Sequence, residues 1–228
     1  RTAGFDNINV DLIFNVPGQS LVGWQADLRR AMALAPEHIS AYSLTVEPGT
    51  GLAQAVATGE VTMPPEDMDH DMFAATRDLL GAGGYSAYEI SNFAREGWAC
   101  RHNLHYWRIE PYLGCGPAAH GFDGRQRYWN VRDLDKYMAA IEAGESPRDG
   151  SETLTDIQLA NEKLLFGLRL TEGISVVEGL GFNSVEAFRR QFAGPLERWS
   201  AEVEISNGRL RTTAAGVFLA DGIAADFM

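Results

Sequence analysis

The pattern of hydrophobic and polar positions in the first 90 residues predicts strands and helices in alternation. Residues 8–14 alternate as a strand does, and Ser20 can cap the next helix, in which apolar residues recur at helical spacing. The same reasoning predicts strands at residues 38–44 and 85–90, and helices at residues 51–58 and 64–82. Strand, helix, strand, helix, strand is an order that favours parallel strands with right-handed crossovers.

After about Asn130 the pattern becomes mainly helical. It predicts a loop at residues 144–151 and helices at residues 131–143, 156–170, 184–192 and 196–201. Asn207-Gly208 predicts a hairpin of residues 203–205 and 209–213, and a last helix follows over residues 214–227. We therefore expect an α/β part over residues 1–130 and a small winged-helix-like α+β domain over residues 131–228.

Composition narrows the classes of function. The chain has 228 residues and a formal net charge of −12, which argues against general nucleic-acid binding. No apolar run approaches the length of a membrane span, and we expect no signal peptide. Two cysteines, Cys100 and Cys115, make no disulfide framework and cannot alone hold an iron–sulfur cluster. A reducing cytoplasm is the predicted location.

The acidic balance reverses between Arg95 and Arg132. This segment holds six arginines against three acidic residues, together with three histidines and seven aromatic side chains. Imidazole can bind a metal, guanidinium can pair with a carboxylate, and aromatic rings can cover a flat apolar ligand. Haem, which is flat, acidic and iron-bearing, would use all three.

Several candidate sites have structural alternatives. Asp11 lies mid-strand, where it can accept hydrogen bonds from a ribose or form a structural salt bridge. The small-residue loop of residues 114–120 can approach a ligand or serve as a tight turn, and it lacks the Lys-Ser/Thr of a phosphate-binding loop. A zinc site would draw on Cys100, His102, His105 and His120, but the spacing is not a standard one.

Four segments carry a resemblance to a known family. Three of them resemble segments of the HemW-type haem chaperones: residues 9–19 (NVDLIFNVPGQ), 38–50 (HISAYSLTVEPGT) and 88–94 (YEISNFA). These chaperones are radical S-adenosylmethionine (SAM) proteins, similar to the oxygen-independent coproporphyrinogen III oxidase. The most specific segment is His102-Asn103-x-x-Tyr106-Trp107, which matches the HNxxYW motif of the chaperones and is not a feature of the oxidase. The resemblance extends over nearly the whole chain, through residues 168–173 (LRLTEG) to the last helix.

The resemblance implies an architecture and a set of ligands. It implies the C-terminal part of a partial (β/α)6 radical-SAM barrel, followed by the winged-helix-like domain. Haem would bind at His102, through its iron, and at Asn103, Tyr106 and Trp107. SAM would contact Asp11 and, more weakly, Thr45, and the loop at residues 114–120 would close over the ligand. Arg95, Arg101 or Arg108 would lie near the haem propionates.

The chain also departs from the family pattern. The CxxxCxxC-type cluster motif and the glycine-rich SAM loop are absent, so SAM and the [4Fe–4S] cluster are expected only in a full-length parent protein. Asn15 and Ala118 stand where glycine is commoner in the family.

The resemblance predicts a protein that binds haem and transfers it to client haem apoproteins. The clients are expected to be membrane-associated, and a homodimer is left open. The chain itself is expected to bind and deliver rather than to catalyse. The alternative is an enzyme of porphyrin biosynthesis, a coproporphyrinogen III oxidase that uses SAM for oxidative decarboxylation.

Overall fold

The computed structural model describes residues 1–228, apart from the side chain of Glu66. Its contacts form two compact units, Arg1–Cys100 and Arg101–Met228. Residues 101–130 group with the later residues because α4 (Arg101–Trp107) packs on α6 (Asp156–Arg169) and β6 (Gln126–Asn130) pairs with β7 (Arg148–Thr153). The contacts therefore divide the chain earlier than residue 130, and a domain boundary at residue 130 stays a prediction.

The first unit contains a four-stranded sheet of order β1-β2-β4-β3. The predicted parallel pairing is confirmed for β1 (Asn9–Phe14) and β2 (His38–Ser43). The prediction of a third parallel strand over residues 85–90 is wrong. Instead, the chain forms β3 (Ser86–Ala87), turns, and returns as β4 (Asn92–Ala94), which pairs antiparallel with both β2 and β3.

A buried carboxylate holds the turn that reverses the chain. Oε1 of Glu89 accepts hydrogen bonds from the backbone N of Ser91, at 2.8 Å, and from Nδ2 of Asn92, at 2.6 Å. Glu89 is only 1% exposed, so these bonds offset the cost of burying its side chain. One buried carboxylate thus accepts from two of the residues that follow it, and the chain turns within the span that was predicted as a strand.

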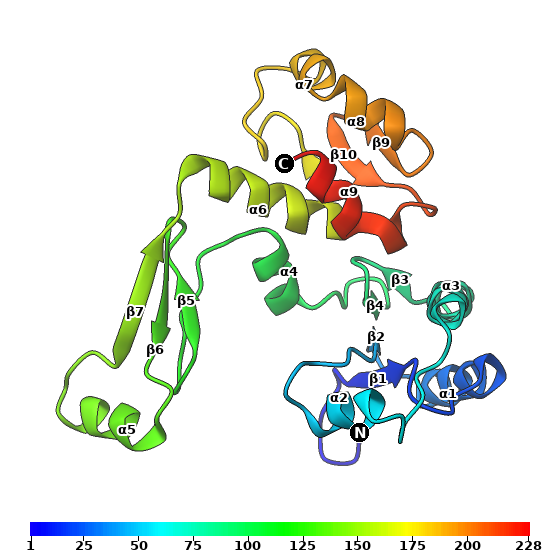
Figure 1. Ribbon diagram of the computed structural model, residues 1–228, viewed down its shortest axis with the longest axis horizontal. Helices are drawn as coiled ribbons and strands as arrows, with labels where there is room; N and C mark the ends of the chain where they lie inside the picture. The colour runs from blue at the N-terminus through cyan, green and yellow to red at the C-terminus, as the bar shows by residue number, and fades with distance from the viewer. The chain divides into compact units, whose positions relative to one another are not determined.

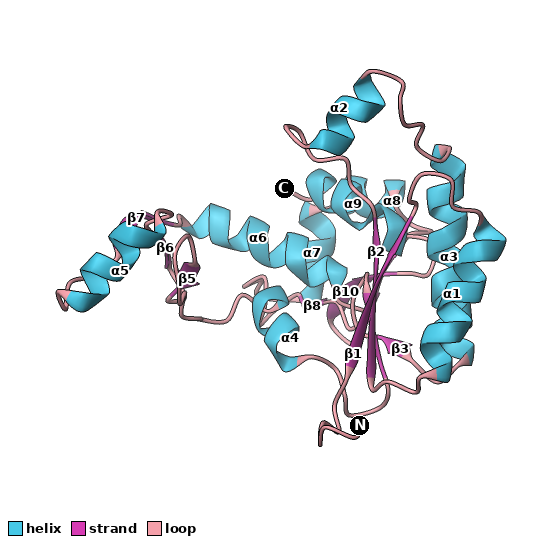
Figure 2. Ribbon diagram, turned by 90° about the horizontal axis from the view of Figure 1, so that it is seen from below, coloured by secondary structure: helices cyan, strands magenta, loops and turns pink.

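Helices cover one side of this sheet. α1 (Leu21–Ala33) and α3 (Glu66–Ala82) lie side by side along β1 and β2 (Figure 2), and α2 (Gly51–Ala57) follows β2. Oγ of Ser20 caps α1 as predicted, accepting from the backbone N of Gly23 at 3.1 Å. Trp24 is buried between the helices, where Nε1 donates to Oγ1 of Thr76 at 2.8 Å. Asn9, Asp11 and Ile13 point to the other side of the sheet and are exposed.

The second unit begins with α4 and a three-stranded antiparallel sheet. Its strands are β5 (His120–Phe122), β6 and β7, and α5 (Leu134–Glu142) lies between β6 and β7 in the chain. The predicted loop at residues 144–151 is therefore wrong for its last residues, which belong to β7. β7 has the sequence RDGSET and is mostly exposed, so no apolar alternation marks it as a strand.

The remaining elements confirm the predicted order of helices and hairpin. After α6 come β8 (Ile174–Ser175), α7 (Val185–Gln191), α8 (Ala193–Arg198), β9 (Val203–Ser206), β10 (Arg209–Thr212), a 3-10 helix η1 (Val217–Leu219) and α9 (Ala220–Asp226) (Figure 1). Asn207 and Gly208 both take positive φ, 50° and 74°, as the hairpin turn requires. These elements enclose a core that includes Leu168, Phe188, Leu210 and Ile223.

Of the helices that the structure describes, none combines the length and the apolar composition that a membrane crossing requires.

Candidate functional site

The HNxxYW segment coincides with the short helix α4. Residues four apart share a face of a helix, so His102 lies over Tyr106, whereas Asn103 lies over Trp107 on a different face. The ring of His102 meets the ring of Tyr106 edge-on, with centroids 4.9 Å apart. His102 and Tyr106 are exposed and Trp107 is partly buried, so the motif divides between a surface face and a packing face.

A row of aromatic side chains leads from His102 toward β5. Tyr106 contacts Tyr112 with centroids 4.6 Å apart, and Tyr112 contacts Phe122 at 6.3 Å. Phe122 is buried in β5, which fixes one end of the row, while His102 forms the exposed end. The arrangement presents an imidazole beside flat apolar rings at the surface of the second unit.

The other histidines of the segment are engaged in different ways. Nδ1 of His105 lies 2.6 Å from Oε2 of Glu110, and its Nε2 contacts the carbonyl oxygen of Pro111. The ring of His120 packs against the ring of Trp129, with centroids 5.9 Å apart. The ring of His102, in contrast, contacts the ring of Tyr106. His105 therefore needs both nitrogens locally, which makes it a poor metal ligand compared with His102.

Trp107 fixes α4 to α6. Its ring lies 5.7 Å from that of Phe166, and the guanidinium of Arg169 lies 5.0 Å from the ring centroid. Its indole Nε1 is buried, and no hydrogen-bond partner for it is found among the described residues. A cavity of about 280 Å³ adjoins this ring and is lined by Tyr106, Trp107, Ile109, Tyr112, Phe122, Arg127, Glu162 and Phe166.

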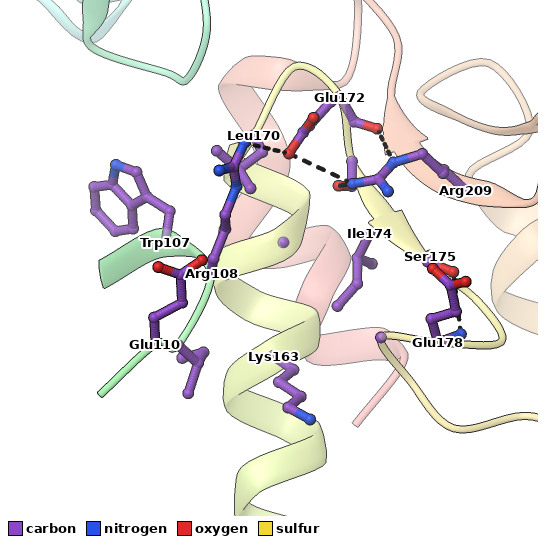
Figure 3. A pocket seen from close by; sticks show the side chains of 14 residues that line it. Trp107, Arg108, Glu110, Lys163, Leu170, Glu172, Ile174, Ser175, Glu178 and Arg209 are labelled. Carbon is purple, nitrogen blue, oxygen red and sulfur yellow. Dashed lines mark hydrogen bonds and ion pairs between the residues drawn. The ribbon is translucent and has the colours of Figure 1, made fainter. Parts of the chain in front are cut away.

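A larger pocket of about 530 Å³ is also lined by Trp107 (Figure 3), and its volume is within the usual range for small-molecule sites. Its edge carries an ion-pair cluster, because Oε1 of Glu172 lies 3.2 Å from Nη2 of Arg108 and 3.5 Å from Nη2 of Arg209. Arg209 also donates to the backbone carbonyl oxygens of Glu172 and Gly173. One carboxylate thus lies between two guanidinium groups at this edge of the pocket.

The three arginines expected near propionates have different surroundings. Arg95 lies in the first unit, where Nε donates to the carbonyl oxygen of Pro36 at 3.1 Å and the guanidinium lies over Tyr85 at 5.0 Å. Arg108 is paired with Glu172. Arg101 is exposed and directly precedes His102 in α4, which makes it the best placed of the three to meet an anionic group at that histidine.

The small-residue loop at residues 114–120 folds back on β6. Nδ2 of Asn130 donates to the carbonyl oxygens of Gly114 and Gly116, at 3.1 Å and 2.9 Å. A Cβ added at Gly114 would collide with the backbone of His120. The close approach of two backbone segments therefore accounts for the glycine at position 114, which is the reason expected if the loop serves as a tight turn.

The two residues expected to contact SAM lie in the first unit but are well separated. Asp11 pairs in register with Ser40, whereas Thr45 follows the end of β2. At about 3.3 Å per residue, Ser40 and Thr45 are roughly 16 Å apart along the chain. Both side chains are exposed, and Oδ1 of Asp11 accepts from Nδ2 of Asn9 at 2.7 Å. An exposed carboxylate can accept hydrogen bonds from a hydroxyl-bearing ligand such as a ribose.

The described residues do not fit a metal cluster. They include no group of three or more His, Cys, Asp or Glu side chains placed to hold a metal ion. Cys100 is half-buried and Cys115 is exposed, and both are free thiols. No step of the proposed function is therefore assigned to an iron–sulfur cluster in this chain.

Comparisons with known proteins identify the relatives of this chain. No protein-family model matches it. It is 40% identical over 176 residues to the heme chaperone HemW of Bacillus subtilis, covering 77% of this chain and 46% of that protein. It is 34% identical over 227 residues to HemW of Mycobacterium tuberculosis, covering 96% of this chain and 55% of that protein. The chain thus spans about half the length of the curated relatives it matches.

A solved structure shares the fold. The radical SAM enzyme coproporphyrinogen III oxidase (HemN) of Escherichia coli matches with a TM-score of 0.72 over 99% of this chain and 56% of that one, at 18% identity. This confirms the predicted fold class, a partial radical-SAM fold with a small additional domain, and at this identity it bears on the fold alone. Together with the HemW relatives, it shows that the chain belongs to the HemW-type radical SAM proteins and corresponds to their C-terminal part.

Proposed function

We propose that the protein binds haem at His102 and passes it to client apoproteins. The observation that carries the proposal is the position of His102, an exposed imidazole at the end of an aromatic row, in a chain whose relatives are named heme chaperones. A neutral imidazole nitrogen is a common iron ligand in haem proteins. In this proposal haem is cargo, so an exposed site suits a molecule that must be released again.

The other residues of the motif have distinct roles in this proposal. Tyr106 flanks the imidazole and covers part of the flat ring, and Arg101 pairs with a propionate. Trp107 supports the site from the packing face of α4, and Asn103, on the same face, helps to hold the helix in place.

The remaining roles belong to a longer protein of this family. In the longer protein, Asp11 and, more weakly, Thr45 contact SAM, and the [4Fe–4S] cluster is held by residues outside this chain. We further propose that the protein is cytoplasmic and that its clients are membrane-associated. A homodimer is left open. The alternative reaction, coproporphyrinogen III oxidation, is supported only by a likeness of fold at 18% identity, which does not carry an activity.

A visible-absorbance haem titration tests the axial ligand. The native chain is expected to give a saturable Soret shift, and His102→Ala should weaken haem binding at least about tenfold, since even indirect supports of a metal ligand contribute that much. His70→Ala is the control, because it removes an exposed imidazole of α3, outside the HNxxYW segment and the loop of residues 114–120, and should leave the affinity unchanged. Equal haem affinity in His102→Ala and the native chain would refute the assignment.

A further inference from the structure

The three motif segments of the first unit meet on the side of the sheet opposite α1 and α3. Asn9 comes from β1, His38 from β2, and Tyr88 from the turn before β4. Nδ1 of His38 lies 2.7 Å from Oδ1 of Asn9, and its Nε2 lies 2.9 Å from the hydroxyl of Tyr88. Asn9 in turn donates from Nδ2 to Oδ1 of Asp11 at 2.7 Å. Four side chains thus form one continuous hydrogen-bonded row.

The chemistry of each group fixes the direction of every hydrogen bond. The Asn9 amide must present its NH2 to Asp11, since the opposite orientation would place two oxygens together. Its oxygen can then only accept, so the proton of His38 lies on Nδ1. Nε2 is left as an acceptor for the O–H of Tyr88. Ser40 lies beside the row, with Oγ 3.1 Å from Nδ2 of Asn9.

The row runs from the interior to the surface. His38 is 4% exposed and Ser40 is 2% exposed, whereas the Asp11 carboxylate at the other end is exposed. Burial lowers the pKa of the His38 imidazole, an effect that the nearby charge of Asp11 partly offsets. The imidazole is therefore neutral at physiological pH, as the assigned pattern of donors requires.

We propose that Tyr88, His38 and Asn9 are positioning residues that hold the Asp11 carboxylate in one orientation for a ligand hydroxyl. Oδ1 is occupied by Asn9, which leaves Oδ2 to accept from the ligand. The ligand part rests on the proposed contact of Asp11 with SAM, whose ribose carries such hydroxyls, and is independent of haem at His102. The three positioning residues do not touch the ligand themselves. Because they order the Asp11 carboxylate in advance, they lower the entropy cost of binding the ligand.

Nuclear magnetic resonance of the imidazole nitrogens tests the row itself. In the native chain His38 should carry its proton on Nδ1. Asn9→Ala removes the acceptor, so the proton should move to Nε2, which then donates to Tyr88. Tyr88→Phe should shift the Asn9 amide and Asp11 carboxyl signals. Tyr42→Phe is the control, because Tyr42 is a half-exposed ring on the same side of β2. It should leave the Asn9 and Asp11 signals unchanged. A proton on Nε2 in the native chain, or unchanged signals in Tyr88→Phe, would overturn the proposal.

A SAM titration of a longer, cluster-bearing protein of this family, in its native form and with the same substitutions, tests the ligand part. The native protein should bind SAM saturably, Asp11→Asn should lose binding, and Tyr88→Phe should bind about three- to tenfold more weakly, as expected for one lost supporting hydrogen bond. Equal SAM affinity in the native protein and in Tyr88→Phe, or unweakened binding in Asp11→Asn, would refute the ligand part. The haem titration at His102 is read separately, so failure of one site is distinguishable from failure of the other.

Discussion

Several non-glycine residues adopt a backbone conformation that normally favours glycine, and Asn15 and Ala118 are two of them. Asn15, directly after β1, has φ of 62°, and Ala118, in the loop before β5, has φ of 59°. At both positions the resemblance described above implies glycine. Asparagine tolerates the left-handed region comparatively well, but alanine does not. The strain is therefore greater at Ala118.

Replacing Ala118 by glycine should stabilise the protein. Relief of the left-handed strain outweighs the entropy that glycine adds to the unfolded chain, so we expect a gain of about 0.5–1 kcal/mol in the free energy of unfolding. Denaturant unfolding of the second unit measures this gain in the free energy of unfolding.

The neighbouring Ala119→Gly is the control. Ala119 is not among the residues with positive φ, so the same substitution should cost stability there, by about 0.5–1 kcal/mol. A stability loss in both variants would contradict the assignment of strain to Ala118.

At the scale of elements, helices with clear caps could be predicted from the sequence. α6 is an example, because Thr155 and Gln158 form a capping box and apolar residues follow at helical spacing. Elements that depend on contacts with distant parts of the chain could not. β7 is exposed and is defined by backbone pairing with β6, and β4 exists because Glu89 reverses the chain.

The same distinction applies to the candidate sites. The helix α4 was not predicted, although the four-residue spacing of His102 and Tyr106 is that of one helical face. The links from Asp11 through Asn9 to His38 and Tyr88 join three separate segments, and no local pattern carries them. The available signal was that polar side chains, Asn9 and Asp11, occupy alternate positions of β1 and therefore share one side of the strand.

The capping box gives a test at this scale. Thr155→Ala removes the hydroxyl that accepts from the backbone N of Gln158 and should destabilise the second unit by about 1 kcal/mol. Thr155→Ser keeps a hydroxyl and should remain within a few tenths of a kcal/mol of the native chain. Chemical denaturation compares the two variants, and equal losses in both would show that the cap contributes little.

The whole molecule contains two separate hydrophobic cores, one in each compact unit. The first is built around Trp24 and Leu28, and the second around Leu168 and Phe188. Each core draws on its own helices and its own sheet, so each unit has the means to unfold on its own. We therefore expect the chain to depart from two-state behaviour.

A pair of equivalent substitutions tests this independence. Leu28 and Leu168 are both fully buried, and changing either to alanine should cost about 2–5 kcal/mol. Amide hydrogen exchange should show the loss of protection within residues 1–100 for Leu28→Ala, and within residues 101–228 for Leu168→Ala. Loss of protection across both units from either variant would mean that they unfold together.

The division of the HNxxYW segment between two faces of α4 has a consequence for how this family evolves. Selection for a stable second unit retains Trp107, which anchors the helix against Phe166, whether or not any ligand is delivered. Under the proposed function, selection for the ligand acts on His102, whose side chain is exposed. A lineage that abandoned haem delivery would therefore drift at the histidine while keeping the tryptophan, and such a half-retained motif would mark the branch on which the activity was lost.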